Sequence, residues 1–215
     1  MGNLVRLHFE REIDWLEARK NGIGASEAAA VFGVSPWLSS LSLWEQKTGQ
    51  SKPKDKSDNA DIQRGKNFEP ILREIFALQH SEFEIKHFPF DMLSQSDRPW
   101  LFSTLDGEII NHETKHLGIL EIKTAAPRSR NDWSKWDQQI PPQYFFQVMH
   151  QLASTGWDFV YLMAALFFEE DISIRTYFFQ REEYQESIDA LIKRETEFWE
   201  ENVQKKKVPN VILNL

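Results

Sequence analysis

The chain has 215 residues, 41% of them hydrophobic and eight of them tryptophan, so it can bury a sizeable core. It contains no cysteine, which excludes disulfides, cysteine-ligated zinc and cysteine-held iron–sulfur clusters. A formal net charge of −8 argues against a general nucleic-acid coat, but it allows a local basic track beside an acidic site. We see no signal peptide and no membrane-spanning apolar stretch, so we expect a cytoplasmic protein without membrane contact.

The first 80 residues are predicted to be mainly helical. Ser26 precedes a run of small apolar residues and is followed by Glu27, a pattern typical of a helix N-terminus. A polar stretch over residues 50–59 is predicted to be a loop. We expect helices over residues 9–20, 26–32, 40–49 and 60–80.

The rest of the chain mixes strands and helices. We expect strands over residues 83–93, 100–110, 117–124, 157–167 and 172–180, and helices over residues 141–154 and 181–204. Residues 125–142, with several prolines, are expected to form a long loop. This order predicts an α/β fold in which residues 1–215 form a single domain with a central mixed β-sheet flanked by helices.

The stretch LGILEIKTA at residues 117–125 carries an acid and a base among aliphatic residues. Side chains two apart on a strand share a face, so Glu121 and Lys123 lie together. Leu120 and Ile122 then face the core. The alternative is the solvated face of an edge strand.

Asp106 precedes that stretch at a spacing that suits a hairpin. A turn that pairs Ile110 with Leu117 places Asp106 opposite Glu121, at ~5 Å between their Cβ atoms. Two carboxylates this close repel unless one is protonated or a cation lies between them. A hard divalent ion such as Mg²⁺ or Mn²⁺ suits oxygen ligands of this kind. The alternative is that Asp106 and Gly107 form a β-turn.

A third carboxylate is offered by Glu69 in RGKNFEP, for which an ordinary exposed helical residue is the alternative. Lys123 beside metal-bound carboxylates can orient or help deprotonate a water and stabilise charge that develops on a phosphate. Together, these residue types describe metal-dependent hydrolysis of a phosphodiester.

Six short stretches resemble, in order, the YqaJ-type viral recombinase family, the phage exonucleases related to lambda exonuclease. This family belongs to the RecB-like branch of the PD-(D/E)xK nucleases. The stretches are GIGASEAAAVFGVSPW, LSLWEQKTG, RGKNFEP, STLDG, LEIKT and YFFQVMHQL, within about residues 9–165. Each stretch is short, and their shared order carries the resemblance. The strands and helix of residues 166–215 are expected to complete the fold.

The resemblance implies roles for individual residues. The residues that match the catalytic core and the glutamine of the late helix are Asp106, Glu121, Lys123 and Gln147. The implied metal ligands are Glu69, Asp106, Glu121 and the backbone carbonyl of Ile122. The residues at positions that bind the 5′-phosphate of a DNA end in lambda-type enzymes are Arg19, Ser26 and Thr104, with Arg128 or Arg130 as a further cation.

Three residues near the start keep simpler interpretations open. Arg19 could be a surface helical residue, and Ser26 could be a plain helix cap. Trp37 in VSPW either packs against the next helix or contacts DNA bases.

The resemblance implies a Mg²⁺-dependent 5′→3′ exonuclease, with Mn²⁺ able to substitute. Such an enzyme degrades one strand of linear double-stranded DNA from a 5′-phosphorylated end. The remaining 3′ single strand passes to a single-strand annealing protein in phage recombination inside a bacterial host cell. It also implies a homo-oligomer such as a ring-shaped trimer, with the tail over residues 204–215 as a contact or a frayed end.

Three other classes of protein stay open. The first is a structure-specific or restriction-like DNA endonuclease. The second is a non-catalytic DNA-end-binding module. The third is a protein-interaction domain, which would leave the carboxylates unexplained.

Overall fold

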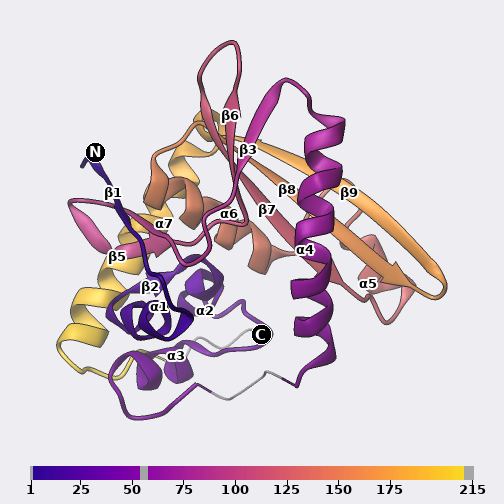
Figure 1. Cartoon of the computed structure of the whole chain (residues 1–215). Helices are drawn as coiled ribbons and strands as arrows, with labels where there is room; N and C mark the ends of the chain where they lie inside the picture. Colours follow the sequence, from indigo (N-terminus) through magenta and orange to yellow (C-terminus); the bar gives the residue numbers. More distant parts are fainter. Residues whose placement is uncertain (1, 54–57, 211–215) are drawn as a thin grey trace.

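A computed structural model of the chain describes residues 2–53 and 58–210, and its strands form two sheets (Figure 1). The first sheet, in spatial order, consists of β1 (Leu4–Leu7), β4 (Met92–Gln95), β5 (Arg98–Ser103) and β2 (Ile23–Gly24). The second consists of β3 (Phe83–Lys86), β6 (Gly107–Asn111), β7 (Leu117–Ala125), β8 (Phe159–Phe168) and β9 (Asp171–Gln180). The predicted mixed α/β fold is confirmed, with its strands divided between two sheets.

Two predicted strands each contain a break, at which the chain changes sheet. The expected strand over residues 83–93 is interrupted after β3 by Pro89 and by Phe90, whose φ is 64°. The expected strand over residues 100–110 leaves the first sheet after Ser103 and enters the second at Gly107. The break before Gly107 leaves Asp106 at the junction of the two sheets.

Strand β7 lies at the centre of the second sheet, antiparallel to β6 and parallel to β8. The alternative of an edge strand is therefore wrong. The crossover from β7 to β8 contains α5 (Arg130–Ser134) and α6 (Pro142–Thr155), so the expected loop over residues 125–142 includes a short helix. A central strand is covered on both faces, which explains why Ile119 and Leu120 are both fully buried.

Helix α4 (Ala60–Gln79) covers one face of the second sheet (Figure 1). The side chain of Asn59 caps it, accepting hydrogen bonds from the backbone of Asp61 at 2.9 Å and Ile62 at 3.2 Å. Leu72 and Phe76 pack with the β7 residues that face this helix. Burial of this stripe fixes which face of α4 lies against the sheet.

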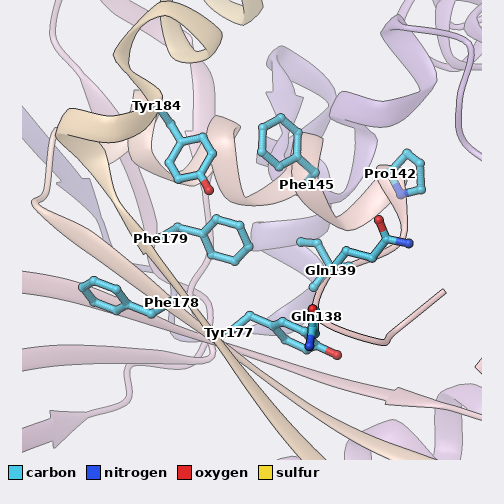
Figure 2. Close-up of a pocket in the computed structure, with 9 residues that line it drawn as sticks. Gln138, Gln139, Pro142, Phe145, Tyr177, Phe178, Phe179 and Tyr184 are labelled. Atoms are coloured by element: carbon cyan, nitrogen blue, oxygen red, sulfur yellow. The ribbon is translucent and has the colours of Figure 1, made fainter. Parts of the chain in front are cut away.

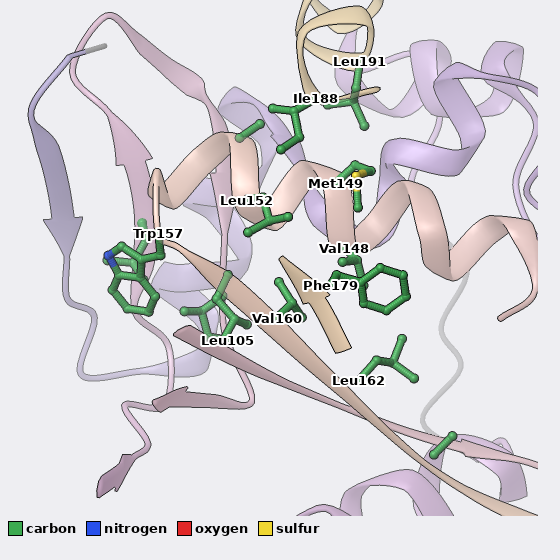
Figure 3. Packing of buried hydrophobic residues seen from close by; sticks show 14 of the residues in the cluster. Leu105, Val148, Met149, Leu152, Trp157, Val160, Leu162, Phe179, Ile188 and Leu191 are labelled. Carbon is green, nitrogen blue, oxygen red and sulfur yellow. The ribbon is translucent and has the colours of Figure 1, made fainter. Parts of the chain in front are cut away.

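Helices α6 and α7 (Gln185–Glu197) cover the opposite face, where Val148 and Leu152 pack with Leu162 and Ile188 (Figure 3). The predicted helix over residues 181–204 has three parts: a 3-10 turn at Arg181–Tyr184, α7, and a π-helix at Phe198–Gln204. Trp199 of the π-helix stacks on Trp100 at 6.1 Å between ring centroids. This packing joins the C-terminal helix to the first sheet.

The N-terminal helices are shorter than predicted. The expected helix over residues 9–20 is α1 (Glu12–Ala18) followed by a 3-10 turn at Arg19–Asn21. Helix α3 (Ser40–Lys47) is capped by Ser39.

The prediction that Ser26 caps a helix is wrong. Ser26 is exposed within a 3-10 turn, Ala25–Glu27, which leads into α2 (Ala28–Val31). The carboxylate of Glu27 accepts the hydrogen bond from Gly24 N at 2.8 Å and pairs with Lys47 at 2.7 Å. Glu27 thus fixes the start of this turn, and the Ser26 hydroxyl is left facing solvent.

Part of the predicted polar loop, residues 54–57, and the apolar end of the tail, residues 211–215, lie outside the described residues. Within the described ranges, no helix is long and apolar enough to cross a membrane.

Candidate active site

Asp106 directly precedes β6 and lies beside the middle of β7, where Glu121 is found. The structure pairs Ile110 with Leu117 and Gly107 with Leu120, so the predicted hairpin register is confirmed. Asp106 stands one residue before the ladder, and its Oδ2 accepts a hydrogen bond from the backbone N–H of Ile122 at 2.8 Å. The alternative of an Asp-Gly hairpin turn is wrong, because Gly107 begins a strand.

Glu121 is buried and surrounded by hydrogen-bond donors. Nε2 of Gln147 donates to its Oε1 at 2.6 Å, and Nζ of Lys123 lies 2.5 Å from the same oxygen. Nε2 of Gln151 donates to the other carboxylate oxygen. Sequence reasoning named Gln147 but missed Gln151. The signal was available, since side chains four apart share a helix face.

The two acids and the lysine alter one another's protonation. Burial, and then the charge of Glu121, raise the pKa of Asp106 well above its ordinary value, while Lys123 opposes this rise. Burial lowers the pKa of Lys123, but the charges of Glu121 and Asp106 outweigh burial and raise it. At neutral pH Lys123 is therefore an ammonium that donates hydrogen bonds.

Glu69 reaches the same place from α4. Together with Asp106, Ile122 and Lys123 it lines a cavity of about 260 Å³. Its carboxylate pairs with Arg73 one helical turn later, and Nε of Arg73 donates to the backbone oxygen of Asp106 at 2.7 Å. Sequence reasoning missed Arg73, although a glutamate followed four residues later by an arginine is a recognised helical pair.

Gly65 faces β7 on the same helix and also lines this cavity. A Cβ atom there would lie 3.4 Å from the Thr124 hydroxyl, which is ordinary contact. A larger side chain would fill part of the cavity.

The donors fit a hard divalent cation in kind. Two carboxylates and the segment that carries the Ile122 carbonyl border one cavity, and such oxygens are the preferred ligands of Mg²⁺. These oxygen ligands do not surround a single point. In residues 2–53 and 58–210, no three acidic, histidine or cysteine side chains are grouped to hold an ion. Glu69 is instead paired with Arg73, and Glu121 with Lys123 and two glutamines.

Arg19 and Ser26 lie close together, as predicted. Nη2 of Arg19 is 3.5 Å from the Ser26 hydroxyl, and its guanidinium lies over the ring of Trp15 at 4.8 Å. Gly24 leaves room for this side chain, because a Cβ there would stand 3.1 Å from Nη2 of Arg19. At Gly22 a Cβ would stand 2.2 Å from the backbone oxygen of Trp100, so a side chain at this position would clash with β5.

The other predicted phosphate ligands are placed differently. Thr104 belongs to the Arg19 neighbourhood, but its hydroxyl donates to the backbone oxygen of Asp91 at 2.7 Å and accepts from Trp15 at 3.0 Å. Arg128 and Arg130 are exposed, and α5, which begins at Arg130, lies beyond α4 from α1 and α2 (Figure 1). The structure therefore connects Arg19, Ser26 and Thr104 through Trp15, and no contact among the described residues adds Arg128 or Arg130 to this group.

A second cavity of about 590 Å³ lies at the start of α6 (Figure 2). Rings of Phe145, Phe179 and Tyr184 point towards it, with Gln138 and Gln139 beside them. No charged side chain is among the described residues that line it. Its polar side chains are the amides of Gln138 and Gln139 and the hydroxyls of Tyr177 and Tyr184.

The family model of the YqaJ-like viral recombinase domain matches residues 14–158, and the chain belongs to this family. It is 28% identical over 196 residues to the Bacillus subtilis (strain 168) protein named "Uncharacterized protein YqaJ". The match covers 88% of this chain but only 56% of that protein, so the chain spans little more than half of its relative.

Solved structures of exonucleases share the fold. The alkaline exonuclease LHK-Exo of Laribacter hongkongensis is 19% identical with a TM-score of 0.59, over 92% of this chain and 100% of that chain. A phage related exonuclease of Haemophilus somnus 129PT is 12% identical with a TM-score of 0.54, over 86% of this chain and 96% of that chain. The architecture is thus the PD-(D/E)xK-like fold of these exonucleases.

Proposed function

We propose that the chain is a Mg²⁺-dependent 5′→3′ exonuclease, folded as one nuclease domain, that degrades one strand of linear double-stranded DNA from a 5′-phosphorylated end. The observation that carries the proposal is the group formed by Asp106, Glu121 and Lys123 beside the cavity that Glu69 enters. Membership of a viral recombinase family and a fold shared with exonucleases agree with it. The direction of digestion rests on the resemblance to lambda-type enzymes.

The proposed ligands of the metal are Glu69, Asp106, Glu121 and the carbonyl of Ile122. Mg²⁺, or Mn²⁺ in its place, would supply a positive charge that stabilises the reacting phosphate, and it would lower the pKa of a bound water. In the hydrolysis, the water oxygen bonds to phosphorus, the bond from phosphorus to O3′ breaks, and O3′ takes up a proton. Lys123, as an ammonium, donates to a phosphate oxygen or to the water and stabilises the negative charge that develops.

The glutamines position the acid. Gln147 and Gln151 each donate to one oxygen of Glu121, which fixes the plane of its carboxylate. Such supporting contacts hold a ligand in place before the ion arrives. The amide of Gln151 is only partly satisfied, because its Oε1 is buried without a hydrogen-bond partner among the described residues.

Arg19 and Ser26 are proposed to bind the 5′-phosphate of the DNA end, with Thr104 beside them. A guanidinium over ring faces and an exposed hydroxyl beside it are suited to a terminal phosphate. Arg128 or Arg130, both exposed, is proposed as a further cation for this phosphate. By the resemblance, the partners are a single-strand annealing protein and further copies of this chain, such as a ring-shaped trimer in the bacterial cytoplasm.

The test is digestion of linear duplex DNA labelled at each end in turn, with Mg²⁺ or EDTA, beside a closed circular control. We expect loss of label from the 5′ end with Mg²⁺ only, and an intact circle. Nicking of the circle would replace the proposal by an endonuclease. Absence of cleavage with Mg²⁺ and with Mn²⁺ would leave a non-catalytic DNA-end-binding module.

A further inference from the structure

Trp37 is a solvent-facing tryptophan in the turn between α2 and α3, with 60% of its surface exposed. The hydroxyl of Ser35 accepts hydrogen bonds from the backbone N–H groups of Trp37 and Leu38, at 3.3 Å each, which fixes this turn. Single exposed apolar residues are common on proteins. The neighbours of Trp37 are what distinguish it.

The indole of Trp37 is connected to the acidic site through one ring. Its centroid lies 6.1 Å from that of Tyr144, on the first turn of α6, and the ring of Tyr144 lies 5.4 Å from Nζ of Lys123. Phe32 packs on Phe146 of the same helix at 4.2 Å, which holds the segment before Trp37 against α6. The rings of Tyr144 and Trp37 therefore form a continuous row of contacts from Lys123 to the protein surface.

Helix α6 also fixes this aromatic pair relative to the acids. Gln147, one turn after Tyr144, donates to Glu121 at 2.6 Å. Tyr144 and the residue that donates to the Glu121 carboxylate thus lie on one helix. A group that stacks on Trp37 lies at a defined distance from the site of hydrolysis.

Charge decides what this surface can bind. The pocket is acidic and the chain carries a net charge of −8, so phosphates alone give a DNA strand little attraction here. Stacking of a base on an aromatic ring needs no phosphate contact, and each stacked base strengthens binding appreciably. A strand whose phosphate meets Lys123 would bring a base within reach of the indole.

We propose that Trp37, backed by Tyr144, is a stacking surface for a nucleobase of the DNA strand whose phosphate lies at Lys123. The inference rests on the proposed function and deepens it, since it names the part of the substrate that this surface contacts. It also predicts a component of DNA affinity that does not depend on salt.

The experiment measures binding, with Ca²⁺ replacing Mg²⁺ so that the DNA stays intact. The probe is a 5′-phosphorylated duplex with two unpaired 5′ nucleotides, the first of which is 2-aminopurine, a base whose fluorescence falls on stacking. We expect Trp37→Leu to weaken binding about tenfold and to remove most of the quenching, and Trp37→Phe to retain most of both. The slope of log affinity against log salt should be equal in wild type and Trp37→Leu.

A matched control is Leu78→Ala, which removes an apolar side chain that is 84% exposed on α4 and should bind as wild type. Thermal melting checks that each variant folds. In Mg²⁺, Trp37→Leu should raise KM with kcat little changed, as for an interaction present before and during the reaction. The stacking surface would be overturned if Trp37→Leu bound and quenched the probe as the wild type does. It would also be overturned if Trp37→Phe and Trp37→Leu lost binding equally. In both cases the proposed function would stand as long as the wild type cleaves DNA. A wild type that neither binds nor cleaves DNA would overturn both.

Discussion

The two arginines that border the candidate sites have opposite surroundings. Arg73 is half-buried, paired with the Glu69 carboxylate and bonded to the backbone oxygen of Asp106. Arg19 lies over aromatic rings beside the Ser26 hydroxyl, and among the described residues the structure gives it no carboxylate partner. An arginine that is paired with a carboxylate holds that carboxylate in position. An arginine that packs on aromatic rings has no opposite charge beside it and can bind an incoming anion.

The same contrast separates the two regions. The cavity lined by Glu69, Asp106 and Lys123 contains acids and the cations that balance them, and it suits a metal ion. The Arg19 region contains a cation and hydroxyls, and it suits a phosphate. Substitutions in the first region should affect every substrate, and those in the second should affect only substrates with the terminal phosphate.

The largest effect is expected from Lys123→Ala. Loss of the ammonium removes a charge that stabilises the reacting phosphate, so kcat should fall about 10²–10³-fold or more. Glu121→Ala should be equally damaging. The measurement is turnover of linear duplex DNA in Mg²⁺, with circular dichroism to check folding. Lys115→Gln, an exposed lysine in the turn of the same hairpin, is the control, and near-wild-type turnover by Lys123→Ala would remove the site.

Arg19→Ala should slow cleavage of 5′-phosphorylated ends about 10- to 100-fold, since a hydrogen bond to a charged group is worth about 1.5–3 kcal/mol. Ends with a 5′-hydroxyl should be slowed far less. The two substrates are compared by kcat/KM. Lys20→Ala is the neighbouring control, because Lys20 is exposed and paired with Glu17. Equal slowing of both ends would refute a phosphate role for Arg19.

Arg73→Met should lower the rate about tenfold on both kinds of end, because supporting contacts of metal ligands typically have effects of this size. Arg73 acts through Glu69 and Asp106 and not through the terminal phosphate. The ratio of rates for the two ends should therefore equal that of the wild type. A variant that discriminated between the ends would show that the two regions are not separate.

The smallest effect is on stability. The raised pKa of Asp106 means that, above the ordinary aspartate value near 3.9, the folded state binds more protons than the unfolded state, so stability falls as pH rises. Asp106→Asn removes this penalty and can still accept the hydrogen bond from Ile122. In EDTA its Tm should exceed that of the wild type by about 2–4 °C at pH 8 and by less at pH 5. Mg²⁺ should raise the Tm of the wild type and not that of the variant, and a variant less stable than the wild type at pH 8 would contradict this account.

Sequence patterns predicted the acidic pocket well because backbone pairing determines it. A single register, Ile110 with Leu117, sets Asp106 beside β7, and the alternation of a strand sets Glu121 with Lys123. The helix that carries Glu69 was also clear, because a cap and an apolar stripe are local signals.

The rest depends on contacts between distant segments, which local patterns do not encode. Ser26 was mistaken for a cap because the residues next to it in the sequence fit one. The carboxylate of Glu27 bonds to Gly24 N instead, and it is paired with Lys47, which lies 20 residues after Glu27. The two sheets were missed for a similar reason. A run of strand-forming residues does not show at which residue the chain changes sheet, and here that change occurs between Ser103 and Gly107.

The parallel pairing of β7 with β8 has a consequence for the order of folding. The β6–β7 hairpin closes over a short turn, so Asp106 and Glu121 can meet early. Gln147 and Gln151 reach Glu121 only after the crossover through α5 and α6 has packed, and non-local closure of this kind is slow. The acids therefore come together before the side chains that hold them, and a variant with a lengthened crossover should fold more slowly yet reach the same active site.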